Sequence, residues 1–573
     1  MLAALLHRLP AQARGIVQTV LFGVAGGLVA VALQKSILFF QGGVWGRLAQ
    51  LPPWQFLAGS LALIVAASLG TGWLLAKFCP EAAGSGIPQL KVAYWRDFGV
   101  IPARLLWVKF AANVLSVGGG LSLGREGPTV QMAGGAASVL SSSVGLAKTE
   151  RRSAAAAGAA AGLSAAFNTP IAAVTFVLEE IVEDLNSRYI GKILLASVVG
   201  AAVLYFLVGK EPAFHIPAVT DFGWKLYLVG PPVAAGAALA GALFQNLTLR
   251  WRRAARAQRR IPGWLSPLVG GLTTWVLGCA LFLGAGRLGV FGLGYDDLGD
   301  VLNGRMLWQV AAFLLAAKLL ATAASFAWGG CGGIFAPCLF LGGMSGAVLA
   351  AVVGVVVPLS PNEQMVLAVV GMSACLGAVV RAPVTSILIV FEMTHEFSLV
   401  PLLMLGALAA QAVSRLCCRN NIYAEILEMD GHVIERYRVA RDFTGWFRQP
   451  AFLLMNAQPR LVSETALDPD GLRALLAGSS HARYPVVDGA GRPVGLLPRA
   501  EAERALAAGE PPRLRPVAVC PAASTLGEVQ KKLAEAGEQI VVLADETGAV
   551  RGLMTLHDLL RAQFAAQEAE TAE

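Results

Sequence analysis

The stretch Leu123-Gly124-Arg125-Glu126-Gly127-Pro128-Thr129-Val130 places two charged residues and a Gly-Pro pair inside a long apolar region. In lipid this combination is expensive, and it usually marks a functional site. Pro128 predicts the first turn of a new helix, where its missing N–H costs nothing. That helix would turn its free N–H groups and its positive dipole end towards Glu126. A carboxylate there occupies the place that an anion would take.

This stretch alone leaves two interpretations of Glu126 open. Protonation or an outward swing of the carboxylate would let an anion bind in its place, which makes Glu126 a proton-controlled gate on an anion path. Alternatively, Arg125 and Glu126 form a structural ion pair in the apolar interior.

The composition is that of a membrane protein. Of the 573 residues, 56% are hydrophobic and 14% are charged, and the mean hydropathy is +0.62. The net charge of +8 comes in part from a run of arginines between Arg250 and Arg260 that separates apolar segments. We interpret this run as a cytoplasmic loop, and Arg8 and Arg14 place the N-terminus on the same side. Binding to nucleic acid is therefore not expected.

The termini and the cysteines add little chemistry. The first apolar run continues beyond the length of a cleavable signal peptide, so we expect none. The eight cysteines show neither a CxxC pair nor metal-ligand spacing with histidine. We expect no metal site, and we interpret the cysteines as small packing residues.

The apolar segments form two similar series, at about residues 13–210 and 226–420. Asn168-Thr169-Pro170 leads into an apolar stretch that ends at Glu179, and Arg381-Ala382-Pro383 leads into one that ends at Glu392. The two prolines, and likewise the two glutamates, are 213 positions apart. Several segments are too short for a full span, and Gly332-Gly333-Ile334-Phe335-Ala336-Pro337 repeats the break at Gly124–Pro128. Paired breaks in two halves predict a transport site between them.

The character of the chain changes after the second series. Residues 426–450 are predicted to be a linker, and residues 451–573 a soluble α/β region with repeats at about 451–505 and 512–565. The two repeats resemble each other in Asp488–Gly495 and Asp545–Gly552, each of which predicts a turn between two strands.

Three further features are candidate anion ligands. In Gly84-Ser85-Gly86-Ile87-Pro88 we expect Ser85 to be the N-cap of a helix, either as a neutral donor to a halide or only as a cap. The N–H groups of Ile334 and Phe335 would face the same cavity, and the Phe335 ring either closes the path or only packs. Tyr423, after the last apolar segment, is either a donor or an interfacial anchor.

These motifs together resemble those of the CLC chloride channels and proton/chloride antiporters, over about residues 15–425. The resemblance rests on Gly84–Pro88, Gly124–Pro128, Gly333–Pro337 and Tyr423 in this order. It implies an all-α polytopic membrane domain, residues 1–425, built as an inverted repeat of tilted, broken helices. It also implies a homodimer with one anion path per subunit. In such a protein Glu126 is the external gating glutamate, and a central chloride is bound by Ser85, Gly127, Ile334, Phe335 and Tyr423.

The same resemblance assigns a role to a second carboxylate. By register Glu180 matches the glutamate that takes protons from the cytoplasm in the antiporters, and Glu179 matches a paired structural carboxylate. The alternative is a solvated acidic helix end made of Glu179, Glu180, Glu183 and Asp184. The role of Lys91 is open, although a cation near Glu180 would weaken proton uptake.

Two other lysines, Lys109 and Lys318, lie within apolar segments. Either they make the anion path electropositive, or they pair with buried carboxylates or carbonyls.

The soluble region resembles a tandem CBS pair, a module that binds adenine nucleotides in some relatives. Thr555 and Asp558, in Gly552-Leu553-Met554-Thr555-Leu556-His557-Asp558, match the positions that hold ribose and phosphate. The corresponding run of the first repeat, Gly495–Glu501, lacks this pattern. At most one nucleotide site is expected, and a purely structural dimerisation module is the alternative.

The sequence thus predicts a proton-coupled chloride antiporter with a glutamate gate, and not an enzyme. It would be a multi-pass protein of the bacterial inner membrane, surrounded by lipid, with both termini in the cytoplasm. The first alternative is a passive voltage- or pH-gated chloride channel on the same scaffold. Intact Ser85, Glu126 and Tyr423 argue against a membrane-anchored nucleotide sensor with a vestigial pore. A Na⁺-coupled organic-solute carrier is remote, because no chain of carbonyls or acids suggests a Na⁺ site.

Overall fold

The computed structural model describes residues 10–185, 187, 189–210, 214, 216–217, 223–258, 260–432, 449–537 and 539–561. The chain divides into two compact units, Met1–Tyr437 and Arg438–Glu573. Helix α19 runs to Met429, past the expected domain edge at residue 425. Residues 433–448 of the expected linker and 562–565 of the second soluble repeat lie outside the described residues.

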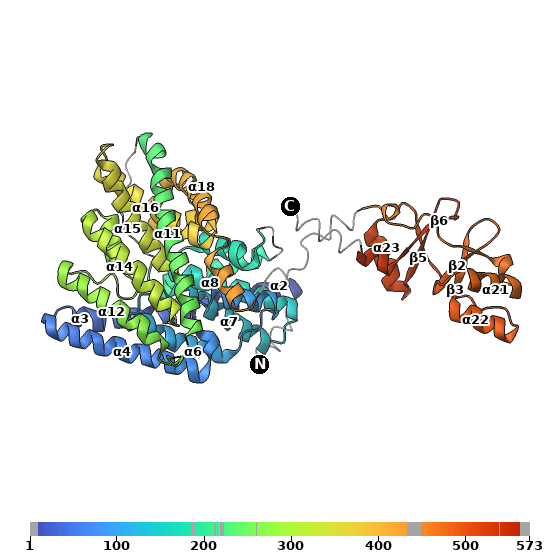
Figure 1. Ribbon diagram of the computed structural model, residues 1–573, viewed down its shortest axis with the longest axis horizontal. Helices are drawn as coiled ribbons and strands as arrows, with labels where there is room; N and C mark the ends of the chain where they lie inside the picture. Colours follow the sequence, from blue (N-terminus) through green and yellow to red (C-terminus); the bar gives the residue numbers. More distant parts are fainter. Residues whose placement is uncertain are drawn as a thin grey trace. The chain divides into compact units, whose positions relative to one another are not determined.

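The first unit is all-helical (Figure 1). Its first half contains α2 (Ala11–Phe40), α3 (Gly46–Leu48), α4 (Pro53–Phe78), α5 (Ile87–Trp95), α6 (Ala103–Asn113), α7 (Glu126–Ser143), α8 (Lys148–Phe167), α9 (Pro170–Phe176) and α10 (Ile190–Leu207). Short π-helical segments continue α2, α6 and α9 over Gln41–Trp45, Val114–Gly118 and Val177–Val182.

The second half repeats this order. It contains α11 (Lys225–Ala257), α12 (Ser266–Ala285), α13 (Tyr295–Leu302), α14 (Trp308–Ala327), α15 (Phe335–Gly354), α16 (Pro361–Val380), α17 (Pro383–Thr394), α18 (Val400–Cys417) and α19 (Ile422–Met429). Short 3-10 turns cover Pro80–Ala82 and Phe397–Leu399.

Among the described residues, nine helical stretches are long and apolar enough to cross a membrane. They are Ala13–Leu48, Pro53–Phe78, Ile190–Leu207, Lys225–Ala257, Ser266–Ala285, Trp308–Ala327, Phe335–Gly354, Pro361–Val380 and Phe397–Met429. Large apolar side chains such as Phe206 and Phe313 lie on their exposed faces, where lipid is the favourable environment. The chain is therefore an integral membrane protein.

The two halves meet at their broken helices. Gly124 and Gly333 pair as a two-residue antiparallel ladder, with N···O distances of 2.7 and 2.6 Å. Because Gly124 precedes α7 and Gly333 precedes α15, this ladder places the starts of two equivalent helices against each other. The backbone N–H and C=O groups of the breaks are thereby satisfied away from lipid.

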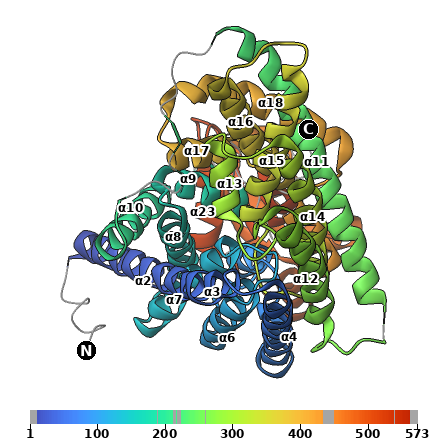
Figure 2. The ribbon, with the colours of Figure 1, turned by 90° about the vertical axis from the view of Figure 1, so that its left-hand side faces the viewer.

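Helices α9 and α17 lie side by side and cap each other (Figure 2). Glu179, which follows α9, accepts hydrogen bonds from the N–H groups of Val384 and Thr385 at the start of α17, at 3.2 and 2.8 Å. Glu392 of α17 accepts bonds from Ile171 and Ala172 at the start of α9, at 2.9 and 2.7 Å. The equivalent helices therefore run antiparallel, and each carboxylate occupies the positive end of the other helix.

These caps predict a loss of stability when one is removed. Glu392→Ala leaves two N–H groups at the start of α9 without their acceptor, which costs about 1–3 kcal/mol. We expect a lower unfolding temperature of the purified protein in detergent, measured by circular dichroism. Glu546→Ala, at an exposed position in the turn after β5, is the control and should leave the unfolding temperature unchanged. Equal unfolding temperatures for both variants would contradict the assigned role of Glu392.

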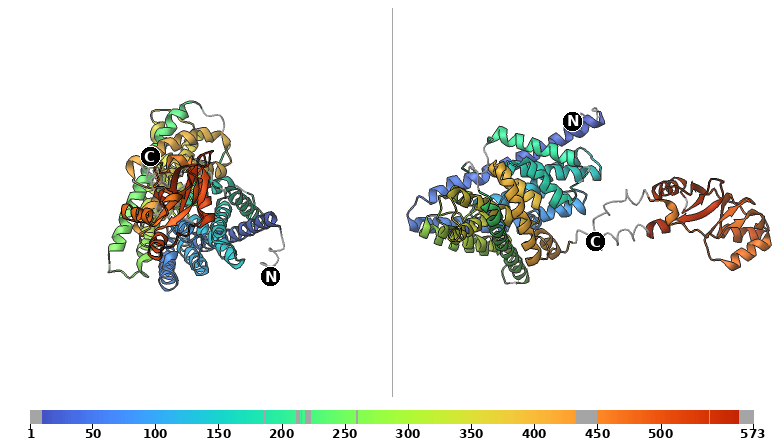
Figure 3. Two further views of the ribbon diagram at one scale, coloured as in Figure 1. Left: turned by 90° about the vertical axis from the view of Figure 1, so that its right-hand side faces the viewer. Right: turned by 90° about the horizontal axis from the view of Figure 1, so that it is seen from above.

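The second unit contains two similar α/β repeats (Figures 1 and 3). The first consists of β1 (Val462–Ser463), α21 (Pro469–Gly478), β2 (Arg483–Val487), β3 (Pro493–Pro498) and α22 (Arg499–Ala508). The second consists of β4 (Ala518–Pro521), α23 (Leu526–Ala536), β5 (Ile540–Ala544) and β6 (Val550–Thr555). Short 3-10 turns cover Ala451–Leu453 and Glu464–Ala466.

Both repeats have the same sheet topology. The strand order is β1-β2-β3 in one sheet and β4-β5-β6 in the other. In each sheet the first two strands are parallel and the last two antiparallel. Buried apolar side chains from strands and helices form one cluster in each repeat, with Val486 and Ala502 among those of the first and Val541 and Val529 among those of the second.

Candidate functional site

Glu126 lies at the start of α7, as the sequence predicts, and Pro128 falls in the first turn. The side chain is fully buried. Its Oε1 accepts a hydrogen bond of 2.7 Å from the hydroxyl of Tyr295, whereas Oε2 has no partner among the described residues. A buried carboxylate oxygen without a protein partner is rare in folded proteins.

The alternative of a buried Arg125–Glu126 ion pair is wrong. Arg125 Nη2 donates to the carbonyl of Ala166 at 3.4 Å, and the side chain lines a cavity. Its Nε and Nη1 have no partner within the described part of the chain. Neighbours in sequence separate here because residue 125 precedes the helix and residue 126 is already in its first turn.

The sequence predicts Ser85 to be the N-cap of α5, and this prediction is wrong. The cap residue is Gly86, in the left-handed region with φ 94°, which glycine adopts without strain. The Ser85 hydroxyl is buried and has no partner among the described residues. A Cβ atom on Gly127 would overlap Ser85 Oγ, and one on Gly333 would lie 3.0 Å from the nitrogen of Gly127. Three breaks from distant parts of the sequence therefore converge at one place.

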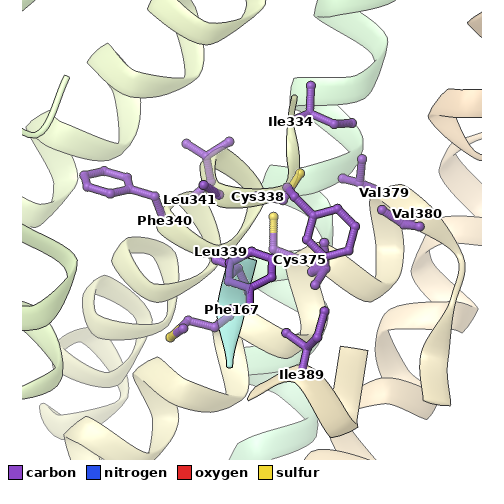
Figure 4. Close-up of a cluster of buried hydrophobic side chains, with 14 of the residues drawn as sticks. Phe167, Ile334, Cys338, Leu339, Phe340, Leu341, Cys375, Val379, Val380 and Ile389 are labelled. Atoms are coloured by element: carbon purple, nitrogen blue, oxygen red, sulfur yellow. The ribbon is translucent and has the colours of Figure 1, made fainter. Parts of the chain in front are cut away.

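The start of α15 presents backbone donors to this place. The N–H groups of Ile334 and Phe335 have no hydrogen-bond partner among the described residues, as is usual in a first helical turn. The helix is embedded in an apolar cluster that includes Ile334, Cys338 and Leu339, with Cys375, Val379 and Val380 from α16 and Ile389 from α17 (Figure 4). The Phe335 ring packs on Phe176 and Phe167, at centroid distances of 5.3 and 5.9 Å. The ring is thus a packing residue at this position.

Tyr423 is not an exposed interfacial anchor. It lies in the first turn of α19, its side chain is fully buried, and its hydroxyl has no partner in the described residues. The hydroxyl approaches Ser85 without the geometry of a hydrogen bond, and it lies within electrostatic range of Glu126 and Glu180. The structure therefore places Ser85, Gly127, Glu126 and Tyr423 near one another.

Glu180 does not belong to a solvated acidic helix end. It is 3% exposed, and its Oε1 lies 2.9 Å from the Nζ of Lys91, which is also buried. Its Oε2 accepts a 3.0 Å bond from Asn421 Nδ2. Lys91 also pairs with Glu183 at 2.7 Å. A buried cation thus holds two carboxylates, and Asn421 connects Glu180 to the turn that carries Tyr423.

Two cavities approach this site from different sides. The first, about 840 Å³, is lined by Arg125, Asn168, Tyr295 and the carboxylates of Asp296 and Asp300, among others.

The second cavity, about 340 Å³, is lined by residues that include Gln89, Gln131, Arg252 and Arg256. Gln131 touches the Ser85 loop, because a Cβ on Gly86 would overlap its Oε1. Helix α4 begins seven residues after Gly46, which lines the first cavity, and ends two residues before Pro80, which lines the second. At 1.5 Å per residue this helix is about as long as a membrane is thick.

Lys109 and Lys318 bind carbonyls, one of the two alternatives that the sequence left. Lys109 Nζ donates to Ala82 and Gly84, at 2.9 and 2.7 Å. Lys318 Nζ donates to Gly289 and Gly292, at 2.8 and 2.7 Å, and more weakly to Val290. Each lysine therefore fixes the loop that precedes a short helix, α5 or α13.

Sequence reasoning missed Tyr295, the hydrogen-bond partner of Glu126. A weak signal was present, because Gly292-Leu293-Gly294-Tyr295 repeats the glycine spacing of Gly84-Ser85-Gly86-Ile87. Gly294 is the N-cap of α13 and is left-handed, with φ 77°, as Gly86 is before α5.

In the second unit, Thr555 and Asp558 bond to each other. Asp558 Oδ2 accepts from the N–H and the hydroxyl of Thr555, at 2.9 and 2.7 Å. In the first repeat Glu501 accepts from Arg504 and from the N–H of Arg513. The Arg504 guanidinium lowers the pKa of Glu501 to about 2. The acid of the first repeat is thus engaged by an arginine side chain, whereas the acid of the second repeat is engaged by Thr555.

Comparison with known proteins agrees with these observations. A family model described as the voltage gated chloride channel matches residues 67–415, and one described as the CBS domain matches residues 514–565. A protein of Salmonella agona (strain SL483) named H(+)/Cl(-) exchange transporter ClcA is 32% identical over 423 residues. The match covers 71% of this chain and 86% of that protein. The protein of that name from Salmonella paratyphi A (strain ATCC 9150 / SARB42) matches equally well.

Solved structures show the same fold. A slow cyanobacterial Cl-/H+ antiporter has a TM-score of 0.65 and 24% identity, covering 73% of this chain and 97% of that one. A eukaryotic CLC transporter has a TM-score of 0.61 and 20% identity, covering 96% of this chain and 98% of that one. The chain therefore belongs to the voltage-gated chloride channel, or CLC, family, and it carries C-terminal CBS domains.

Proposed function

We propose that this protein exchanges chloride for protons across the membrane, with Glu126 as its gate. The observation that supports the anion site most directly is the pair of buried hydroxyls, Ser85 Oγ and Tyr423 Oη, neither with a partner among the described residues. Leaving such donors unpaired is costly, and chloride would satisfy both. The free N–H groups of Ile334 and Phe335 and the close approach of Gly127 complete the site, since helix starts favour anions.

In the proposed cycle Glu126 competes with chloride for the positive end of α7. The ionised carboxylate blocks the path between the two cavities, and protonation releases it. An anion then enters from the first cavity and reaches Ser85 and Tyr423. The similar proteins are named H(+)/Cl(-) exchange transporters. These names support chloride and protons as the substrates of this protein.

Glu180 is the proposed internal proton carrier. It is buried, it bonds to Asn421, and it lies within electrostatic range of Tyr423. A carboxylate in this position exchanges protons with the cytoplasmic side without using the chloride entrance. Together Glu126 and Glu180 would provide two stops for a proton within the membrane.

One observation favours the alternative of a passive chloride channel. Lys91 lies 2.9 Å from Glu180 Oε1, and a buried carboxylate paired in this way also fits a purely structural ion pair. Proton movement against its own gradient in reconstituted liposomes separates the exchanger from the channel.

The anion site predicts weaker chloride binding when its hydroxyls are removed. Each hydroxyl contributes one neutral donor, so Ser85→Ala combined with Tyr423→Phe should raise the chloride Kd by roughly tenfold to a hundredfold. Isothermal titration of the purified protein with chloride measures this change. Ser373→Ala removes another buried, unpartnered hydroxyl on α16 and is the matched control. An unchanged Kd in the double variant would refute the site.

The orientation follows from the charges around the second cavity. Arg252 and Arg256 at the end of α11 pair with Asp430, and this basic end belongs in the cytoplasm. We therefore place both termini there, in a bacterial inner membrane, with the first cavity facing outwards. We also propose a homodimer, and an adenine nucleotide at Thr555 and Asp558 that regulates transport.

A further inference from the structure

The hydroxyl of Tyr295 makes the one hydrogen bond that the structure records for the gate carboxylate among the described residues. It donates to Glu126 Oε1 at 2.7 Å. The other carboxylate oxygen, Oε2, is buried and without a partner in the described part of the chain. Hydrogen bonds to an ionised group are stronger than those between neutral groups. Tyr295 therefore stabilises the ionised Glu126 side chain in the position that it occupies in this structure.

Tyr295 is itself held firmly. It is the first residue of α13, and its ring packs edge-on against Phe214, at a centroid distance of 5.4 Å. The loop before it is fixed by Lys318, and Asp297 Oδ2 accepts a 2.7 Å bond from the N–H of Gly289. A donor on such a rigid support loses little conformational entropy when it bonds to the carboxylate.

The internal repeat supports a site role independently. Lys109 fixes the loop that presents Ser85, and Lys318 fixes the loop that presents Tyr295. Each half thus offers one hydroxyl from a lysine-bound loop with a left-handed glycine cap. Ser85 approaches Gly127 beside the second cavity, and Tyr295 reaches Glu126 beside the first.

We propose that Tyr295 is the positioning residue of the gate. Its hydroxyl holds the ionised Glu126 in the closed position, and so limits how often chloride passes without a proton. This inference rests on the proposed role of Glu126. It gives that role a second residue, which acts through the carboxylate and makes no contact with the central site of Ser85 and Tyr423.

The test is Tyr295→Phe, which removes the hydroxyl and keeps the ring. Purified full-length protein is reconstituted into liposomes, and chloride and proton fluxes are recorded together under a chloride gradient. We expect the chloride flux to rise by roughly tenfold, the equilibrium effect of one such bond, with more chloride ions moved per proton. Tyr205→Phe, on an exposed face of α10, is the matched control and should change neither quantity.

The same substitution is then made in Glu126→Ala, where the hydroxyl has no carboxylate to hold. There the fluxes with and without Tyr295→Phe should agree within twofold. An unchanged or reduced flux in the wild-type background would overturn the proposal, as would an equal factor in both backgrounds. The unsubstituted protein provides the reference, because chloride flux without proton movement there would refute the exchanger itself. Coupled transport that Tyr295→Phe leaves unaltered would refute the role of Tyr295 alone.

Discussion

Glu126→Gln is expected to abolish proton movement while chloride still crosses the membrane. Glutamine keeps the shape of the side chain, and its amide oxygen still accepts a hydrogen bond from the hydroxyl of Tyr295. It cannot carry a proton. Removing a positioned acid–base group lowers proton transfer by ~10²-fold or more. Chloride flux continues, because the neutral amide competes with the anion for the positive end of α7 less strongly than a carboxylate does.

The measurement uses reconstituted liposomes, with chloride followed by an electrode and protons by the external pH. Glu150→Gln changes an exposed carboxylate on α8 and serves as the control, with both fluxes unaltered. Proton flux at the wild-type level in Glu126→Gln would mean that another group carries the proton, and the gate assignment would be wrong.

Glu180→Gln should separate the two substrates in the same way from the cytoplasmic side. The amide oxygen still accepts from Lys91, and Lys91 keeps its ion pair with Glu183, whereas the bond that Asn421 donates to the second oxygen is lost. The proton loses its internal stop, and proton flux should fall by ~10²-fold or more. Chloride flux is expected to continue, because Ser85 and Tyr423 are unchanged.

Glu183→Gln is the matched control for this variant, since it lies on the other side of the same lysine. It should keep coupled exchange, because the carboxylate that accepts from Asn421, and so connects to the turn of Tyr423, is Glu180. If Glu180→Gln left proton movement intact, Glu180 would be a structural partner of Lys91, and the internal proton carrier would have to be sought elsewhere.

The architecture could be predicted from the sequence because broken helices leave a local signature. Gly-Pro breaks at Gly124–Pro128 and Gly332–Pro337, and the offset between Pro170 and Pro383, are visible in the chain itself. Helix starts follow from proline, and spans follow from apolar length. Glu126, Ser85 and Tyr423 lie at or near such signals, and the structure brings them together.

The partners of these residues could not be predicted in the same way. Sequence adjacency favours Arg125 as the partner of Glu126, yet the hydroxyl that bonds Glu126 comes from Tyr295, 169 positions away. Ser85 matched an N-cap pattern, but the left-handed Gly86 starts the helix. Lys91 contacts its carboxylates because α5 packs beside the turn that follows α9. Each of these contacts depends on tertiary packing, about which a local pattern carries no information.

The central claim, coupled exchange of chloride and protons, is tested most directly in liposomes that contain the purified protein. A chloride gradient is imposed with no initial pH gradient, the voltage is fixed, and the external pH is recorded. Our account predicts that protons move against their developing gradient as chloride runs down its own, and that the movement stops when a proton-conducting agent is added. Chloride flux with no proton movement would contradict the account and identify a passive chloride pathway.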